Sequence, residues 1–259
     1  MFKTMRLLTA LSLTLLALAQ AGARTPQTAS PAGPAAGQLA ETNRKIRELA
    51  DAKKYDEAAK LAETAAEEAS RLFGPDSAEV SAQLSGLAEL HVARRESGKA
   101  KKALARVLEL REKRPGPSQK FEQDALELYT CLVATDLRSR FDPEIPERIS
   151  RVLVEDSVLG QGLRLSPDGR ELEVGSSASK PPPSYPPEAR SARASGAAVM
   201  VIDIDEAGKV VSATPLGCTS RLFMGAGQEA ALRATFKPTL VNGRPVKVRS
   251  ITFYRWIVQ

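Results

Sequence analysis

The sequence predicts a multidomain protein in which an all-α helical repeat is followed by a small α+β domain. Three observations lead to this prediction. Over residues 39–140 the composition is dominated by Ala, Leu, Glu, Lys and Arg, with apolar residues at helical spacing. This pattern repeats with a period of about 42 residues. Over residues 185–259 the pattern predicts helix, strand, strand, helix and strand in that order.

Residues 1–23 have the features of a secretory signal peptide. Lys3 and Arg6 precede an uncharged run over residues 7–19, and small residues at 19–23 provide two A-x-A cleavage sites. The run is shorter than the roughly 20 residues that a membrane-spanning helix needs. We therefore expect an exported protein that loses residues 1–23, with an uncleaved inner-membrane anchor as the alternative.

The charge of the chain is mildly positive. The formal net charge is +6, and removing residues 1–23 takes away one Lys, one Arg and no acidic residue, which leaves +4. Basic residues alternate with acidic ones along the predicted helices. This pattern favours solvated helix faces, so no nucleic-acid partner is expected.

The two cysteines, Cys131 and Cys218, fall in different predicted domains. Because no Cys lies near the cleavage sites, a lipid-anchored lipoprotein is not expected. An oxidising compartment permits a disulfide between the two residues. The sequence alone gives no distance between their Cα atoms, and we expect two unpaired thiols.

Composition divides the rest of the chain. Residues 24–38 are small, polar or Pro and predict a disordered tether before the repeats. Residues 141–175 predict short strands, one of them at 151–155, and a hairpin. The hairpin strands would be 162–165 and 171–174, joined by the Ser-Pro-Asp-Gly turn at 166–169. A Ser/Pro-rich linker at 176–184 leads into the last domain, 185–259.

The helical region carries motifs of a known family. The sequence YDEA at residues 55–58 opens one helix and GKA at 98–100 opens the matching helix of the next copy, while Gly-Pro pairs recur at 74 and 116. Residues 39–140 thus resemble tetratricopeptide repeats, most closely the long repeats of kinesin light chains. The resemblance implies a scaffold that holds peptides or partner proteins. A plain helical bundle is the alternative.

In the C-terminal domain, Pro, Gly and small residues indicate where the predicted helices and strands begin and end. A helix begins at Pro186, a strand over 198–205 has one wholly apolar face, and Pro215 predicts an edge position for the end of the next strand, 209–216. Small residues line the predicted helix 225–235. A long final strand, 246–258, is expected after the turn Asn242-Gly243.

These residues resemble the C-terminal domain of TonB, the protein that couples inner-membrane energy to outer-membrane transporters in Gram-negative bacteria. The motifs occur in family order over residues 185–259: YP at 185–186, IDEAGKV at 204–210, FKP at 236–238, GRPV at 243–246 and a terminal aromatic strand with Phe253. The resemblance implies binding by strand addition, in which a short segment of a transporter pairs with the sheet edge.

The resemblance places the partner on the final strand. A change in apolar phase along this strand predicts a bulge near Arg249-Ser250. Four cations of this region predict a basic margin for an acidic partner segment, with a solvated face as the alternative: Arg244, Lys247, Arg249 and Arg255. The predicted partner-binding residues are Arg244, Val246, Val248, Arg249, Ser250, Thr252, Tyr254 and Trp256.

No catalytic, cofactor-binding or metal site is predicted. The single histidine, His91, lies on an apolar helix stripe, where a buried, hydrogen-bonded side chain is expected. Asp203 and Asp205 alternate on the polar side of a strand without a third ligand. We expect a protein that is not an enzyme and needs no cofactor.

The leading hypothesis is a periplasmic adaptor whose repeats hold one partner while its C-terminal module contacts TonB-dependent outer-membrane receptors or other envelope proteins. It would associate with membranes only through partners or an uncleaved signal. An anchored, energy-transducing TonB-family protein is one alternative. Another is a structural envelope protein in which the hairpin over 163–174 caps the sheet edge.

Overall fold

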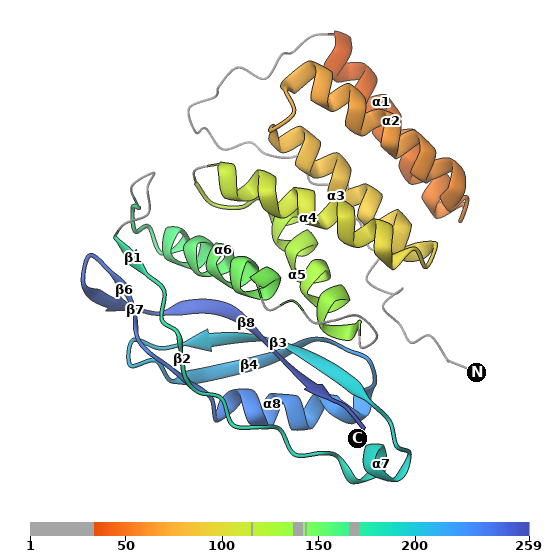
Figure 1. Cartoon of the computed structure of the whole chain (residues 1–259). Helices are drawn as coiled ribbons and strands as arrows, with labels where there is room; N and C mark the ends of the chain where they lie inside the picture. Colours follow the sequence, from red (N-terminus) through yellow and green to blue (C-terminus); the bar gives the residue numbers. More distant parts are fainter. Residues whose placement is uncertain (1–33, 115, 137–141, 143, 166–170, 259) are drawn as a thin grey trace. The chain divides into compact units, whose positions relative to one another are not determined.

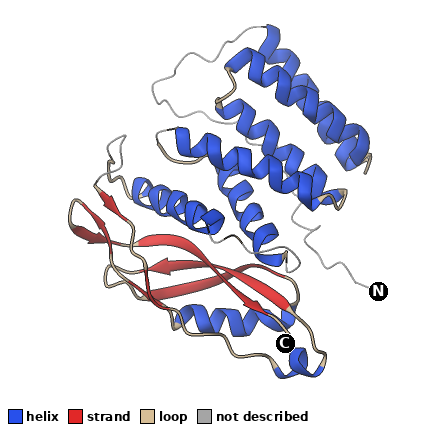
Figure 2. Cartoon of the chain, viewed as in Figure 1, coloured by secondary structure: helices blue, strands red, loops and turns tan. Residues whose placement is uncertain are grey.

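The chain folds into two compact units that differ in secondary structure. The computed structural model describes residues 34–114, 116–136, 142, 144–165 and 171–258 (Figure 1). The helical unit comprises the described residues of Met1–Lys113 and Lys120–Ala125, and the sheet unit comprises those of Arg114–Gln119 and Leu126–Gln259. Helices form the first unit, whereas the second combines helices with strands (Figure 2). The predicted fold class is confirmed, and the predicted signal peptide lies outside the described residues.

The helical unit is built from helices that pack on their neighbours in sequence: α1 (Pro34–Asp51), α2 (Tyr55–Phe73), α3 (Ala78–Ala93) and α4 (Ser97–Lys113). Helix α1 begins at Pro34, so the predicted tether over 24–38 overlaps the start of this helix. Small side chains let α2 approach its neighbours closely. The buried face of α2 consists of Ala58, Ala59, Ala62, Ala65 and Ala69.

Backbone conformations in this unit recur with the period of the sequence. Lys53 and Arg95 have φ of 58° and 62°, and each ends its helix in a Schellman motif. In the first motif Lys54 N–H donates to the Leu49 carbonyl (2.8 Å), and in the second Glu96 N–H donates to the His91 carbonyl (2.8 Å). Gly74 and Gly116, which are separated by the same period, have φ of 92° and 96°. The sequence period therefore corresponds to a structural one, while the tetratricopeptide type remains a prediction.

Helix α3 begins at a side-chain cap. Ser77 Oγ accepts a hydrogen bond from Val80 N–H at 3.3 Å. We expect Ser77→Ala to destabilise the helical unit by about 1 kcal/mol, because a helix N–H loses its acceptor. Urea unfolding followed by far-UV circular dichroism measures the loss. Ser77→Asp keeps an acceptor and should retain most of the stability, whereas equal losses in both variants would contradict a capping role.

The sheet unit contains an antiparallel sheet of three strands in the order β4-β3-β8. These strands are β3 (Gly196–Ile204), β4 (Val210–Cys218) and β8 (Val248–Trp256). With the helices α7 (Pro187–Ser191) and α8 (Met224–Leu232), the order helix, strand, strand, helix, strand is as predicted. In the turn before β4, Asp205 Oδ1 accepts hydrogen bonds from Ala207 N–H (3.0 Å) and Lys209 N–H (2.8 Å).

Two predictions for residues 141–175 are wrong. Residues 151–155, predicted as a strand, lie inside helix α6 (Glu144–Gly160). The β-branched residues there suggested a strand, but Ile149, Val152 and Asp156 fall on one helical face and are buried together. The predicted hairpin is replaced as well, because β1 (Leu172–Glu173) pairs with β6 (Thr239–Val241) and not with 162–165. The predicted turn at 166–169 lies outside the described residues.

Short strands complete the sheet unit. Strand β2 (Ser177–Ser179) pairs with β5 (Thr235–Phe236), so part of the predicted linker over 176–184 is a strand. Strand β6 pairs with β7 (Arg244–Val246) across the turn Asn242-Gly243. Both turn residues have positive φ, 52° and 74°, as a tight hairpin requires.

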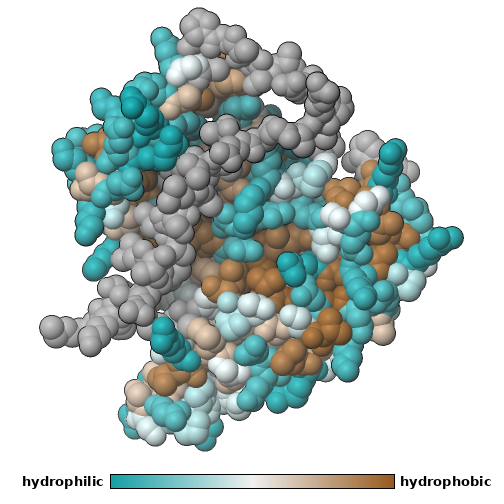
Figure 3. Space-filling model, turned by 180° about the vertical axis from the view of Figure 1, so that it is seen from behind, coloured by the Kyte–Doolittle hydropathy of each residue, from teal (hydrophilic) through white to brown (hydrophobic). Residues whose placement is uncertain are grey.

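Some large apolar side chains are exposed in the described part of the chain. Ile257 and Val258, 61% and 38% exposed, directly follow β8. The end of the last strand thus presents apolar surface. Seen from behind, apolar patches (brown) lie among hydrophilic side chains (teal) (Figure 3). The other exposed large hydrophobic residues are Leu72, Val211, Leu222 and Leu232.

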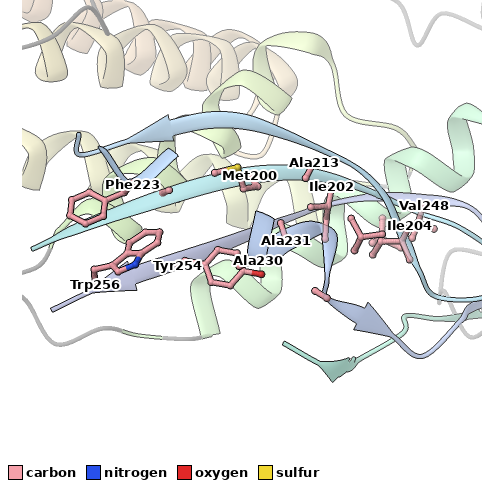
Figure 4. Close-up of a cluster of buried hydrophobic side chains, with 14 of the residues drawn as sticks. Met200, Ile202, Ile204, Ala213, Phe223, Ala230, Ala231, Val248, Tyr254 and Trp256 are labelled. Atoms are coloured by element: carbon pink, nitrogen blue, oxygen red, sulfur yellow. The ribbon is translucent and has the colours of Figure 1, made fainter. Parts of the chain in front are cut away.

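Helix α8 covers one face of the three-stranded sheet and closes the main core of this unit. Its buried residues Gly227, Ala230 and Ala231 are small, as predicted, which allows close packing on the strands. Figure 4 shows side chains of β3, β8 and α8 converging on this core. The core members labelled there are Met200, Ile202, Ile204, Ala213, Phe223, Ala230, Ala231, Val248, Tyr254 and Trp256.

Candidate protein-interaction strand

Strand β8 forms one edge of the sheet. It pairs with β3 continuously from Gly196↔Trp256 to Ile204↔Val248, without the bulge predicted near Arg249-Ser250. The backbone N–H of Arg249 donates to Ser157 Oγ on α6 at 3.0 Å, so it points away from β3. In an antiparallel strand the N–H and C=O of one residue point to the same side, and the side alternates along the chain. The outer edge of β8 is therefore formed by the backbone groups of residues 249, 251, 253 and 255.

Five of the predicted partner-binding residues point their side chains into the protein. Trp256 illustrates this: its ring lies 4.8 Å from that of Phe223, and its Nε1 donates to the Ser184 carbonyl at 2.9 Å. In strand addition these five would act through the position of the strand and not through exposed side chains. They are 3–5% exposed: Val248, Ser250, Thr252, Tyr254 and Trp256.

Arg244 and Val246 are not part of the final strand. Both lie in β7, which pairs with β6, and the chain breaks its strand geometry at Lys247 before β8 begins. The single long strand predicted over 246–258 is therefore wrong at its start. The change of apolar phase that suggested a bulge has another cause, because both faces of β8 pack against helices.

The second face of β8 packs on helix α5 (Lys120–Thr135). Ile251 and Phe253 contact the cluster formed by Cys131, Ala134 and Val199. Strands buried on both faces carry apolar residues at odd and even positions. This explains why β8 lacks simple alternation. The Cys131 side chain is buried here, and its Sγ lies 2.9 Å from the place that a Cβ on Gly217 would occupy.

The predicted basic margin is partly neutralised by acidic side chains of the same unit. Arg249 Nε donates to Asp203 Oδ1 across the strands at 2.8 Å, and this hydrogen bond, with the charge of Asp203, raises the pKa of Arg249. Lys247 Nζ lies 4.0 Å from Glu206 Oε1. Arg255 donates to the Asp136 carbonyl at 3.2 Å. Arg244 is exposed on the β6–β7 hairpin.

Lys180 belongs to this region although its sequence position did not suggest it. Its Nζ lies 4.9 Å from the ring centroids of both Phe253 and Tyr254. Burial lowers the pKa of Lys180, while the two rings favour its charged form. Lys180 precedes three prolines, and that segment was predicted to be a linker.

The opposite edge of the sheet, β4, offers fewer backbone groups to an added strand. Pro215 has no N–H, as its predicted edge position allows. The carbonyl of Ala213 accepts a hydrogen bond from Gln228 Nε2 of α8 at 2.8 Å. The two edges of this sheet are thus not equivalent, and β8 is the more regular one.

The single histidine is buried and hydrogen-bonded, as predicted. His91 is 4% exposed, and its Nδ1 lies 2.8 Å from Glu96 Oε2. Partial burial of Glu96 would raise its pKa, but hydrogen bonds from His91 and Lys99 outweigh this effect and the pKa is lowered. Arg94 also pairs with Glu96 at 2.9 Å. This network ties the end of α3 to the start of α4.

Among the residues that the structure describes, no group of His, Cys, Asp and Glu side chains could hold a metal ion. The two aspartates considered from the sequence have structural roles, since Asp203 pairs with Arg249 and Asp205 caps the β3–β4 turn. Within the same described ranges, no helix combines the length and the apolar character needed to cross a bilayer.

Comparison with known proteins agrees with the fold of the sheet unit. No curated protein matches this sequence. Residues 181–256 match the family model of the Gram-negative bacterial TonB protein C-terminal domain, and this range contains α7, β3, β4, α8 and β8. The C-terminal part of this chain is therefore similar to the C-terminal domain of Gram-negative bacterial TonB proteins.

Proposed function

We propose that the protein is a periplasmic adaptor, without catalytic activity, whose TonB C-terminal domain binds an outer-membrane transporter or another envelope protein by strand addition. One observation carries the proposal: β8, the last strand of the matched domain, is an edge of the sheet with a regular ladder on its inner side only. An extended partner segment would add backbone hydrogen bonds at residues 249–255.

The helical unit is proposed to hold a second protein. Its helices pack in sequence order and its turns repeat with the period of the sequence, an arrangement that supports a repeat scaffold. Such scaffolds bind segments of other proteins on surfaces shared by several repeats. The adaptor would thus join two partners in the envelope.

Site-specific crosslinking in cells tests strand addition. Lys247 precedes β8 and Ile257 follows it, and they are 67% and 61% exposed. Each is replaced in turn by a photoreactive amino acid. We expect adducts with the N-terminal segment of an outer-membrane protein, identified by mass spectrometry. Val211, 57% exposed on β4, is the matched control position. Equal adducts from Val211, or adducts only within the chain, would contradict partner binding at β8.

The positive charge of Arg244, just before β8, should strengthen binding of an acidic partner segment. Arg244 is exposed, and we expect Arg244→Glu to weaken capture of an acidic segment from Ile257 by roughly fivefold, since an exposed ion pair contributes up to about 1 kcal/mol. The effect should fade as salt is raised. Lys237→Glu, an exposed reversal outside β8, is the control. An equal effect of both reversals would point to net charge alone.

A further inference from the structure

Helix α6 packs against the first part of β8 (Figure 1). Besides the bond from Arg249 N–H to Ser157 Oγ (3.0 Å), the Gln161 side chain just after the helix donates to the Lys247 carbonyl at 2.8 Å. Both are backbone groups on the side of the strand that faces away from β3. The start of the outer edge therefore already has hydrogen-bonding partners from its own chain.

Side chains strengthen this contact. The hydroxyl oxygens of Ser150 and Ser250 lie 2.6 Å apart. Val154 and Val158 of α6 belong to the same buried cluster as Val248. Apolar burial and hydrogen bonds thus hold the helix in place together.

The helix is nevertheless not part of the matched domain. The family match covers residues 181–256, and α6 ends at Gly160. A helix can offer the strand only side-chain partners, whereas an added strand offers a ladder of backbone hydrogen bonds. A partner strand and α6 would need the same backbone groups of Lys247 and Arg249, so they exclude each other there.

We propose that α6 is a displaceable intramolecular cover of the start of the β8 edge, and that a partner strand pairs with the edge over its full length only when α6 leaves it. This inference rests on strand addition at β8 as the function of the domain. The apparent affinity for a partner is then the intrinsic affinity multiplied by the fraction of molecules with α6 released. Any change that weakens the α6 contact raises partner binding, and any change that fixes it lowers partner binding.

The first experiment weakens the cover. In the full chain, Ser157→Ala with Gln161→Ala removes both side-chain partners of the strand backbone. We expect crosslinking of the partner from Ile257 to rise at least about fivefold, because two hydrogen bonds together contribute at least about 1 kcal/mol. Glu147→Ala with Arg151→Ala changes two exposed side chains of the same helix and should leave capture unchanged. An unchanged or lower yield in the first variant would contradict the cover.

The second experiment fixes the cover. The Ser150 and Ser250 hydroxyl oxygens lie 2.6 Å apart, so this contact is the place to introduce a disulfide between α6 and β8. In Ser150→Cys with Ser250→Cys, oxidation should reduce partner capture at least about tenfold, because the open fraction is removed. Dithiothreitol should restore it in the same sample. Because the chain has two native cysteines, the wild-type protein and Ser150→Cys alone receive the same treatments as controls.

The third experiment needs no partner. Hydrogen exchange of the full chain compares α6 amides with the β8 amides that face β3. We expect α6 and the Arg249 amide to exchange together, at least about tenfold faster than the inner β3–β8 ladder, through a partial opening. Identical rates with identical urea dependence would make α6 an integral part of the core and refute the cover.

The outcomes separate the inference from the function on which it rests. If α6 opens but no variant captures a partner at β8, strand addition is wrong. If partners are captured equally with the disulfide formed and reduced, strand addition stands and the cover is wrong.

Discussion

Replacing Phe223 with alanine is expected to lower the free energy of unfolding of the sheet unit by about 3–5 kcal/mol, the range for buried aromatic residues. Phe223 is fully buried, with its ring 4.8 Å from that of Trp256 and 6.3 Å from that of Tyr185. The cavity would lie between the matched domain's first helix and its last strand. Loss of this packing should also abolish partner capture, because β8 would no longer be held in the sheet.

Urea unfolding followed by Trp256 fluorescence measures this effect. Because the chain has a single tryptophan, the signal reports the sheet unit alone. Leu222→Ala changes the neighbouring residue, which is 41% exposed, and should alter stability by no more than about 0.5 kcal/mol. A Phe223→Ala loss as small as that of Leu222→Ala would contradict the packing described for this core.

Adding a single methyl group at Gly196 is expected to be nearly as harmful. A Cβ at this position would lie 2.0 Å from Phe223 Cε2 and 2.6 Å from Thr219 Oγ1. The Phe223 ring cannot move away, because Trp256 and Tyr185 surround it. We expect Gly196→Ala to cost about 3 kcal/mol, the upper end for overpacked cores.

A double-mutant cycle tests the stated cause. In the Phe223→Ala background the ring is gone, so Gly196→Ala should cost much less there than in the wild type, a difference of about 1–3 kcal/mol. Gly225→Ala is the control glycine: it lies in α8 with no atom within 4 Å of the added Cβ, and it should be neutral or slightly stabilising. Additive effects of the two substitutions would contradict a clash with Phe223.

Local signals predicted the main elements of the matched domain, α7, β3, β4, α8 and most of β8. An apolar face at 198, 200, 202 and 204 predicted β3, Pro215 predicted an edge strand, and small residues at 227, 230 and 231 predicted a helix packed on a sheet. Each of these signals depends on a short stretch of chain and on one neighbouring surface. These elements therefore formed where the sequence predicted them.

Sequence patterns gave wrong predictions for elements that are buried on more than one side. The run Val152-Leu153-Val154 has high strand propensity, yet it lies in α6. Val152 and Val154 are both buried although they point to opposite sides of this helix. In β8, helix α8 covers the face of Tyr254 and α5 covers that of Phe253. A change of apolar phase then marks two buried faces and not a bulge.

The sequence by itself determined the order helix, strand, strand, helix, strand in the last domain and its similarity to the TonB C-terminal family, and it suggested the final strand as the binding strand. Only the tertiary structure decided what lies against that strand. Ser157 and Arg249 are 92 positions apart, and Ser150 and Ser250 are 100 apart. Serine hydroxyl groups occur on any solvated helix, so their pairing with a distant strand leaves no periodicity in the sequence. The cover over the β8 edge follows from how α6 packs, and packing is a property of the folded chain.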